Sequence, residues 1–112
     1  MITYAGNGTL RGLPITDTGT AYASPGSNGS INIIGTGTIS AKDGSGVSAY
    51  IFRAVGRYLA DGKLYDIGVS FRSGSNPNPV GSLAFLSNAV VLNKDEYDRS
   101  GNGMTVNYIW KP

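Results

Sequence analysis

The sequence predicts a single all-β domain over residues 1–112, either a small antiparallel β-barrel of about seven or eight strands or a strongly coiled β-sandwich. Clusters of turn-forming residues recur at intervals of about ten residues, which is typical of short antiparallel strands. The stretches between these clusters are rich in β-branched and aromatic residues, and the 17 glycines disfavour long helices.

Five clusters of turn-forming residues divide the chain. They are residues 24–29, 42–46, 61–62, 74–79 and 100–103. The strands expected between and beside them are residues 2–11, 14–23, 30–41, 47–60, 63–72, 81–94 and 104–111.

The Asp61-Gly62 pair joins segments 47–60 and 63–72 in the clearest hairpin, because Asp-Gly tolerates the positive φ angles of a two-residue type I′ turn. Alternation along the second of these strands separates an apolar side from a polar side. The apolar side holds Tyr65, Ile67, Val69 and Phe71, and the polar side holds Asp66, Ser70 and Arg72. We expect the apolar side to be buried and the polar side to face water.

Two segments also fit a helical pattern. Apolar residues in 47–60 match the spacing of an amphipathic helix, but Gly56 and the many aromatic and β-branched residues favour a strand. In segment 81–99 a helix would carry one apolar face, made of Leu83, Leu86, Val90 and Tyr97. The alternative fold class is therefore α+β, with a helix in 81–99.

Glycine weakens a strand, so glycines within strands indicate a local requirement. These glycines are Gly6, Gly8, Gly35, Gly37, Gly56 and Gly68. They predict either sharp bends in a coiling sheet or free space for a ligand or another backbone. Barrels of this size are either filled by side chains or hollow enough for one small molecule, and both alternatives stay open.

The candidate ligand-binding residues are Arg53, Arg57, Tyr58, Tyr65, Arg72 and Trp110. If the faces that carry the arginines point into a barrel, they supply an anion-binding pocket. If they point outward, which is the favoured alternative, they are solvated cross-strand partners. Val106, Tyr108 and Trp110 share one face of the last strand, and we expect them to pack onto the core. The alternative is that they anchor another subunit.

The acidic cluster in residues 93–99 indicates a solvated loop. The stretch Asp98-x-Ser100-x-Asn102-Gly103 matches the first half of a calcium-binding loop, but Ile109 stands where the bidentate Glu is required, so no metal site is predicted. No catalytic residue is assigned, because no pair of acids outside this cluster is placed in one cleft.

Composition excludes several classes of function. Without Cys or His the chain has no disulfide, no zinc–thiolate site and no histidine general base, and no cofactor is predicted. The nine basic residues are not clustered, so nucleic-acid binding is not expected. No apolar run is long enough to cross a bilayer, and no signal peptide is evident. We therefore expect a soluble protein without a membrane partner, which is cytoplasmic if Met1 is the native start.

Three functional hypotheses remain from the sequence. The leading one is a non-catalytic β-barrel domain that binds a small molecule or a partner protein. The first alternative is a structural subunit that forms a homo-oligomer through exposed strand edges. The second alternative is a small barrel enzyme, such as a cyclase or isomerase, which uses Tyr, Asp or Arg groups.

Overall fold

The computed structural model describes residues 1–72 and 76–111 of the chain. Its elements in chain order are β1 (Ile2–Leu10), β2 (Leu13–Pro25), η1 (Ser27–Gly29), β3 (Ser30–Ala41), β4 (Gly46–Tyr58), β5 (Leu64–Phe71), β6 (Val80–Gly81), η2 (Ala84–Leu86), β7 (Val90–Tyr97) and β8 (Gly103–Trp110), where η1 and η2 are single 3₁₀ turns. The all-β prediction is confirmed, and six of the seven expected strands lie within two residues of their predicted bounds.

The segment expected as a strand over 81–94, or as a helix over 81–99, is neither. It contains the end of β6, the turn η2 and the strand β7, and no α-helix occurs in the described part of the chain. Residues 93–97 of the acidic cluster belong to β7 and are not a loop. The expected turn at 74–79 lies partly outside the described residues, because Gly74 and Ser75 are not among them. Within residues 1–72 and 76–111, no helix has the length and apolarity needed to span a membrane.

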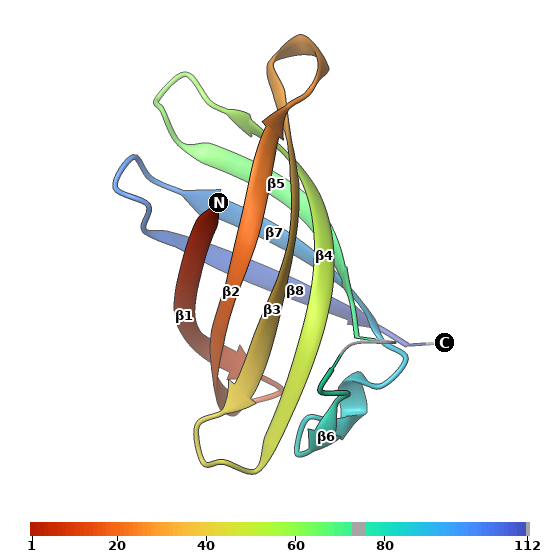
Figure 1. Ribbon diagram of the computed structural model, residues 1–112. Coiled ribbons are helices and arrows are strands. Elements are labelled where there is room, and N and C mark those ends of the chain that lie inside the picture. The colour runs from red at the N-terminus through yellow and green to blue at the C-terminus, as the bar shows by residue number, and fades with distance from the viewer. Residues whose placement is uncertain (73–75, 112) are drawn as a thin grey trace.

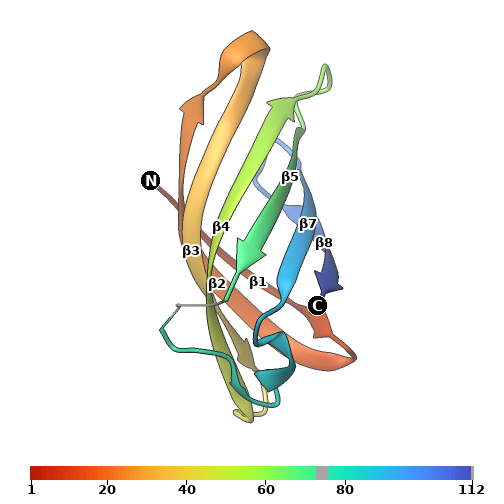
Figure 2. The same cartoon turned by 90° about the vertical axis from the view of Figure 1, so that its right-hand side faces the viewer.

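All strands belong to one antiparallel sheet with the order β1-β2-β3-β4-β5-β7-β8, and β6 pairs with the beginning of β4. The strands bend and cross obliquely, so the sheet coils into a half-barrel (Figures 1 and 2). This single layer corresponds to the small-barrel alternative, not to a two-layered sandwich. Strands β1 and β8 are the two ends of the sheet order, and neither has a second partner among the described strands.

The hairpin between β4 and β5 is confirmed, but its turn differs from the prediction. Leu59 N–H donates to the Lys63 carbonyl, which leaves a three-residue loop, and of the loop residues only Gly62 has a positive φ, at 86°. A three-residue loop that ends in a left-handed residue also suits the twist of a hairpin. The Asp61 carboxylate accepts from the Lys63 N–H and holds this loop.

The inner face of the half-barrel carries the core. The main cluster is Leu10, Ile15, Ile39, Tyr50, Leu83, Leu86 and Val91. Leu83 and Leu86 are fully buried, and they belong to the segment around η2 that lies across one end of the half-barrel (Figure 1). The Arg11 guanidinium, from the turn between β1 and β2, lies 4.5 Å from the centre of the Phe85 ring and ties this end together.

Three glycines provide room for aromatic rings on the inner face. The register places Tyr4, Gly19, Gly37 and Tyr50 in one row across four strands. A Cβ atom on Gly19 would overlap the Tyr4 hydroxyl group, and one on Gly37 would overlap that of Tyr50. A Cβ on Gly35 would lie 2.6 Å from the Phe52 ring. At Gly35 and Gly37 the space is therefore filled by the protein's own side chains and does not form a ligand cavity.

The prediction for the two sides of β5 is wrong. Asp66, Ser70 and Arg72 point inward and are at most 5% exposed, whereas Ile67 on the opposite side is 51% exposed. Alternation shows that the two sides differ, but the direction in which the sheet coils decides which side is enclosed. Tyr65, Ile67, Val69 and Phe71, which were expected inside, lie on the outer face of this strand.

Candidate interaction surface and polar interior

The outer face of the sheet carries large apolar side chains where β4, β5, β7 and β8 lie side by side. Seven of them are between 47 and 61% exposed, and we call this set the outer apolar face: Ile51, Val55, Ile67, Leu92, Val106, Tyr108 and Trp110. At roughly 100 Å² exposed per side chain they offer on the order of 700 Å². Monomeric proteins rarely leave apolar patches above a few hundred Å² uncovered.

The strand register makes the outer apolar face continuous. Val55 lies opposite Ile67 on β5, and Leu92 lies opposite Tyr108 on β8. A further row crosses the sheet from Ile51 through Phe71 and Val90 to Trp110. Arg53 and Lys94 are the charged side chains in these three rows. The face is therefore apolar across four strands and reaches the free edge of β8.

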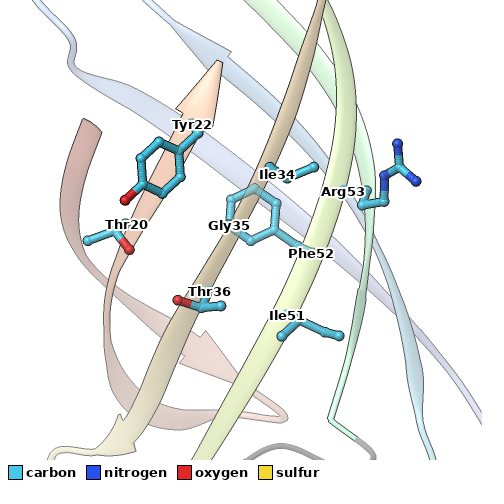
Figure 3. A pocket seen from close by; sticks show the side chains of 8 residues that line it. All are labelled: Thr20, Tyr22, Ile34, Gly35, Thr36, Ile51, Phe52 and Arg53. Atoms are coloured by element: carbon cyan, nitrogen blue, oxygen red, sulfur yellow. The ribbon is translucent and has the colours of Figure 1, made fainter. Parts of the chain in front are cut away.

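An open groove of about 600 Å³ borders this face on β2, β3 and β4. Figure 3 shows Thr20, Tyr22, Ile34, Thr36 and Ile51 around it, with the Phe52 ring behind Gly35 and the Arg53 guanidinium extending away. A second groove of about 480 Å³ adjoins it and shares Thr20, Thr36 and Ile51. Both grooves lie on the outer face, so a small molecule in either of them would bind outside the half-barrel.

The inner face holds a hydrogen-bonded chain of two tyrosines and an aspartate. The Tyr50 hydroxyl donates to Asp17 Oδ1 at 2.6 Å, so the Tyr4 hydroxyl donates to the oxygen of Tyr50. Burial raises the pKa of Asp17 and of Tyr50, and it raises the pKa of Tyr4 to about 12. Both hydroxyl protons are already donated within the chain, which suits a structural connection between β1, β2 and β4 better than stabilisation of a developing anion.

Arg72 lies beside this chain. Its guanidinium is 5.2 Å from the centre of the Tyr50 ring, and its Nη1 donates to Ser70 Oγ at 2.6 Å. Arg72 is 3% exposed, and its Nε has no hydrogen-bond partner among the described residues. Burial lowers the pKa of Arg72.

Two buried aspartates face each other further along the inner face. Asp66 on β5 lies opposite Asp95 on β7, and they are 4% and 7% exposed. Asp95 accepts hydrogen bonds from Asn93 Nδ2 at 2.6 Å and from the Thr105 hydroxyl, whereas Asp66 Oδ1 has no partner within the described chain. Burial, together with the neighbouring Asp95, raises the pKa of Asp66 to about 8. Near neutral pH Asp66 is thus mainly protonated, which avoids two adjacent buried charges.

The structure does not bring the six predicted ligand-binding residues together. Arg53 and Arg57 are exposed on the outer face, where Arg57 Nη1 donates to the Asn28 carbonyl at 2.8 Å, so the hypothesis of an inward arginine pocket is wrong. The outward alternative holds for both. Tyr65 is on the outer face, and Tyr58 and Trp110 are 63% and 61% exposed. Arg72 alone of the six is buried on the inner face.

The last strand also differs from the prediction. Val106, Tyr108 and Trp110 do share a face, but this face points outward and does not pack onto the core. The side chains of β8 that contribute inside are Ile109, which packs against the main cluster, and Thr105, which donates to Asp95. The sequence therefore revealed the apolar side of this strand but not its direction.

Sequence reasoning missed the polar groups of the inner face, which are Tyr4, Asp17, Tyr50 and the pair Asp66 and Asp95. They come from five strands, and only the register of the folded sheet places them next to one another. The one available signal was the polar side of β5, which holds Asp66 between apolar neighbours.

The residues that resemble half of a calcium loop form the turn between β7 and β8. Asp98 Oδ1 accepts from the Ser100 and Asn102 N–H groups at 2.9 and 3.0 Å, so this carboxylate serves the turn. Across the described ranges, no group of three or more acidic side chains is placed to hold a metal ion.

Comparison with known proteins gives no match: no family model, no curated protein and no solved structure matches the chain. Function is therefore inferred from the geometry of this molecule alone.

Proposed function

We propose that the chain is a non-catalytic, self-assembling β subunit whose outer apolar face binds another copy of the chain. The observation that carries this proposal is the exposure of seven large apolar side chains on one continuous face. The estimated area, on the order of 700 Å², is close to the about 800 Å² that each partner contributes to an interface of standard size.

The energetics favour covering this face. At about 25 cal/mol per Å², removing it from water on two copies gives roughly 35 kcal/mol. Association costs about 4–15 kcal/mol in lost translational and rotational freedom, with further losses for ordering side chains. Imperfect packing and the desolvation of polar groups offset much of this gain, so the area supports association without determining its affinity.

A second copy suits this surface better than a small molecule does. The face extends across four strands and is not enclosed, whereas small ligands are bound in concave sites that cover most of their surface. It carries few charges, and a symmetric contact between identical faces then brings few like charges together. The small-molecule hypothesis stays a prediction, and the outer grooves are the place where it applies.

Sedimentation velocity over a wide concentration range tests the proposal. The wild-type chain is expected to sediment as an oligomer. Leu92→Lys, which places a charge at the centre of the outer apolar face, should shift it to a smaller species. Thr38→Lys is the matched control, because Thr38 lies on the outer side of the same sheet within the threonine-rich region of β2 and β3.

The proposal fails if the wild-type chain is a monomer at every concentration. The control Thr38→Lys should sediment like the wild type. The proposal also fails if Leu92→Lys sediments in the same way, because the oligomer would then not use this face. Circular dichroism of each variant shows whether it has kept its fold.

A further inference from the structure

Strand β8 is an unprotected edge of the sheet. It is eight residues long, and the whole strand contains neither a charged residue nor proline. One edge of β8 pairs with β7, and no other described strand pairs with its second edge, which is the free side of the strand. Alternate N–H and C=O groups on this free side therefore have no strand to bond.

Native proteins rarely leave such an edge open. They place lysine, proline or a bulge on it, or they cover it with another element, because a free edge is a template for pairing with another strand. Strand β8 has none of these side-chain devices, and its register with β7 runs without a break from Gly103 to Trp110. This pattern indicates an edge strand that is suited to pairing with a further strand.

We propose that β8 pairs in antiparallel fashion with β8 of a second copy, about a two-fold axis near the middle of the strand. The two half-barrel sheets then become one continuous sheet. This inference concerns a second contact, distinct from the contact between outer faces proposed above, and it rests on the backbone edge and not on the exposed side chains of four strands.

An identical strand is the partner that this edge fits. Around a two-fold axis the residues near the axis face themselves or near neighbours, and the residues at one end face the other end of the partner strand, so a charge near the middle of β8 would oppose its own copy. No such charge is present. The outward side chains Met104, Val106, Tyr108 and Trp110 would meet outward side chains of the same strand in the partner, and cross-strand pairs of aromatic and β-branched residues stabilise a sheet. The two outer apolar faces would also join without a break.

Strand β1, at the other end of the sheet order, fits this role less well. It is also uncharged, but it contains Gly6 and Gly8, which weaken a strand. Its outward side chains are Thr3, Ala5, Asn7 and Thr9, and they would not extend an apolar face. The apolar rows run toward β8 and end there, which selects β8 over β1.

Single-cysteine cross-linking tests the pairing directly, because the chain contains no cysteine. Val106→Cys, Asn107→Cys and Tyr108→Cys sample the middle of β8, and Asn7→Cys in the middle of β1 is the matched control. A disulfide requires Cα atoms within about 7 Å. Under mild oxidation we expect a covalent dimer from the one or two β8 positions nearest the axis, and none from Asn7→Cys.

A charge placed near the two-fold axis provides a second test of the pairing. Asn107 is exposed at the open edge, so Asn107→Lys should leave the fold intact but oppose two lysines in the paired edge. In the Val106→Cys or Tyr108→Cys background it should abolish the cross-link, whereas Asn107→Gln should preserve it. Leu92→Lys should leave the cross-link in place, because Leu92 lies on β7, one strand in from the free edge of β8.

The pairing is overturned if no β8 cysteine gives a dimer, or if Asn7→Cys cross-links as readily as the β8 variants. It is also overturned if Asn107→Lys leaves the cross-link unchanged. The two proposals can fail separately. If the β8 cysteine variants cross-link as expected but Leu92→Lys has no effect on sedimentation, only the contact between outer faces is contradicted.

Discussion

At the scale of single residues, Asp66 shows how burial on the inner face determines charge. Its carboxyl group lies against Asp95, with Oδ1 buried and without a partner among the described residues. An aspartate has a pKa of about 3.9 when unfolded, whereas that of Asp66 in the folded chain is about 8. Between these two values the folded chain holds a proton that the unfolded chain has lost.

The stability of the fold should therefore fall as the pH rises from about 4 to about 8, and it should lose little more above that range. Asp66→Asn imitates the protonated carboxyl group and cannot ionise. We expect this variant to be more stable than the wild type at about pH 9, by an amount on the order of a few kcal/mol, and to resemble it at about pH 4, the ordinary pKa of an aspartate.

Urea denaturation at several pH values, at a protein concentration where the chain is monomeric, measures the difference between the two chains. Taking the difference removes the contributions of other titrating groups. If the two stability curves run parallel from pH 5 to pH 9, Asp66 does not retain its proton in the fold.

At the scale of elements, the apolar residues of β8 and those of the segment around η2 differ in how much they contribute to the stability of the monomer. Leu86 is fully buried at the end of the half-barrel, whereas Trp110 is 61% exposed on β8. The stability of the monomer depends on the first, and the second is available to a partner. Hydrophobicity alone would rank Trp110 among the core residues.

We expect Leu86→Ala to lower the free energy of unfolding by about 2–5 kcal/mol, because it creates a cavity where Leu83 and Leu86 close the core. Trp110→Ala should change it by less than about 0.5 kcal/mol, as substitutions of exposed residues usually do. Chemical denaturation of both variants as monomers provides the comparison. A loss from Trp110→Ala that matches the loss from Leu86→Ala would show that β8 packs inward.

At the scale of the whole molecule, the inner face of the half-barrel combines the hydrophobic core with buried, hydrogen-bonded polar groups, and its exterior is apolar over four strands. A fold of this kind gains stability when its exterior is covered. The proposed association with another copy would involve the native state only, so it would raise the apparent melting temperature by mass action.

The melting temperature of the wild-type chain should therefore rise with protein concentration, and that of Leu92→Lys should rise less steeply. Differential scanning calorimetry over a range of concentrations measures both. A wild-type melting temperature that is independent of concentration would show that covering the outer apolar face does not stabilise the fold.

Much of the local structure follows from sequence pattern. The strands β1 to β5 and β8 lie where turn-forming residues bound alternating stretches, because turns and extended backbone depend on near neighbours. The segment 81–94 was misjudged because its apolar residues serve two purposes, the cover around η2 and the strand β7. The hydrogen-bonded chain from Tyr4 to Asp17 was not predictable, since it joins residues 46 positions apart in its longest link.

The sequence by itself determined that the chain forms antiparallel strands and that each strand has two unlike sides, since side chains alternate whenever the backbone is extended. Only the tertiary structure decided which side is enclosed, because the coiling of the whole sheet selects the inner face. That selection buries Asp66 and Arg72, exposes Ile67 and Trp110, and leaves the apolar sides that alternation revealed on the exposed surface of the sheet.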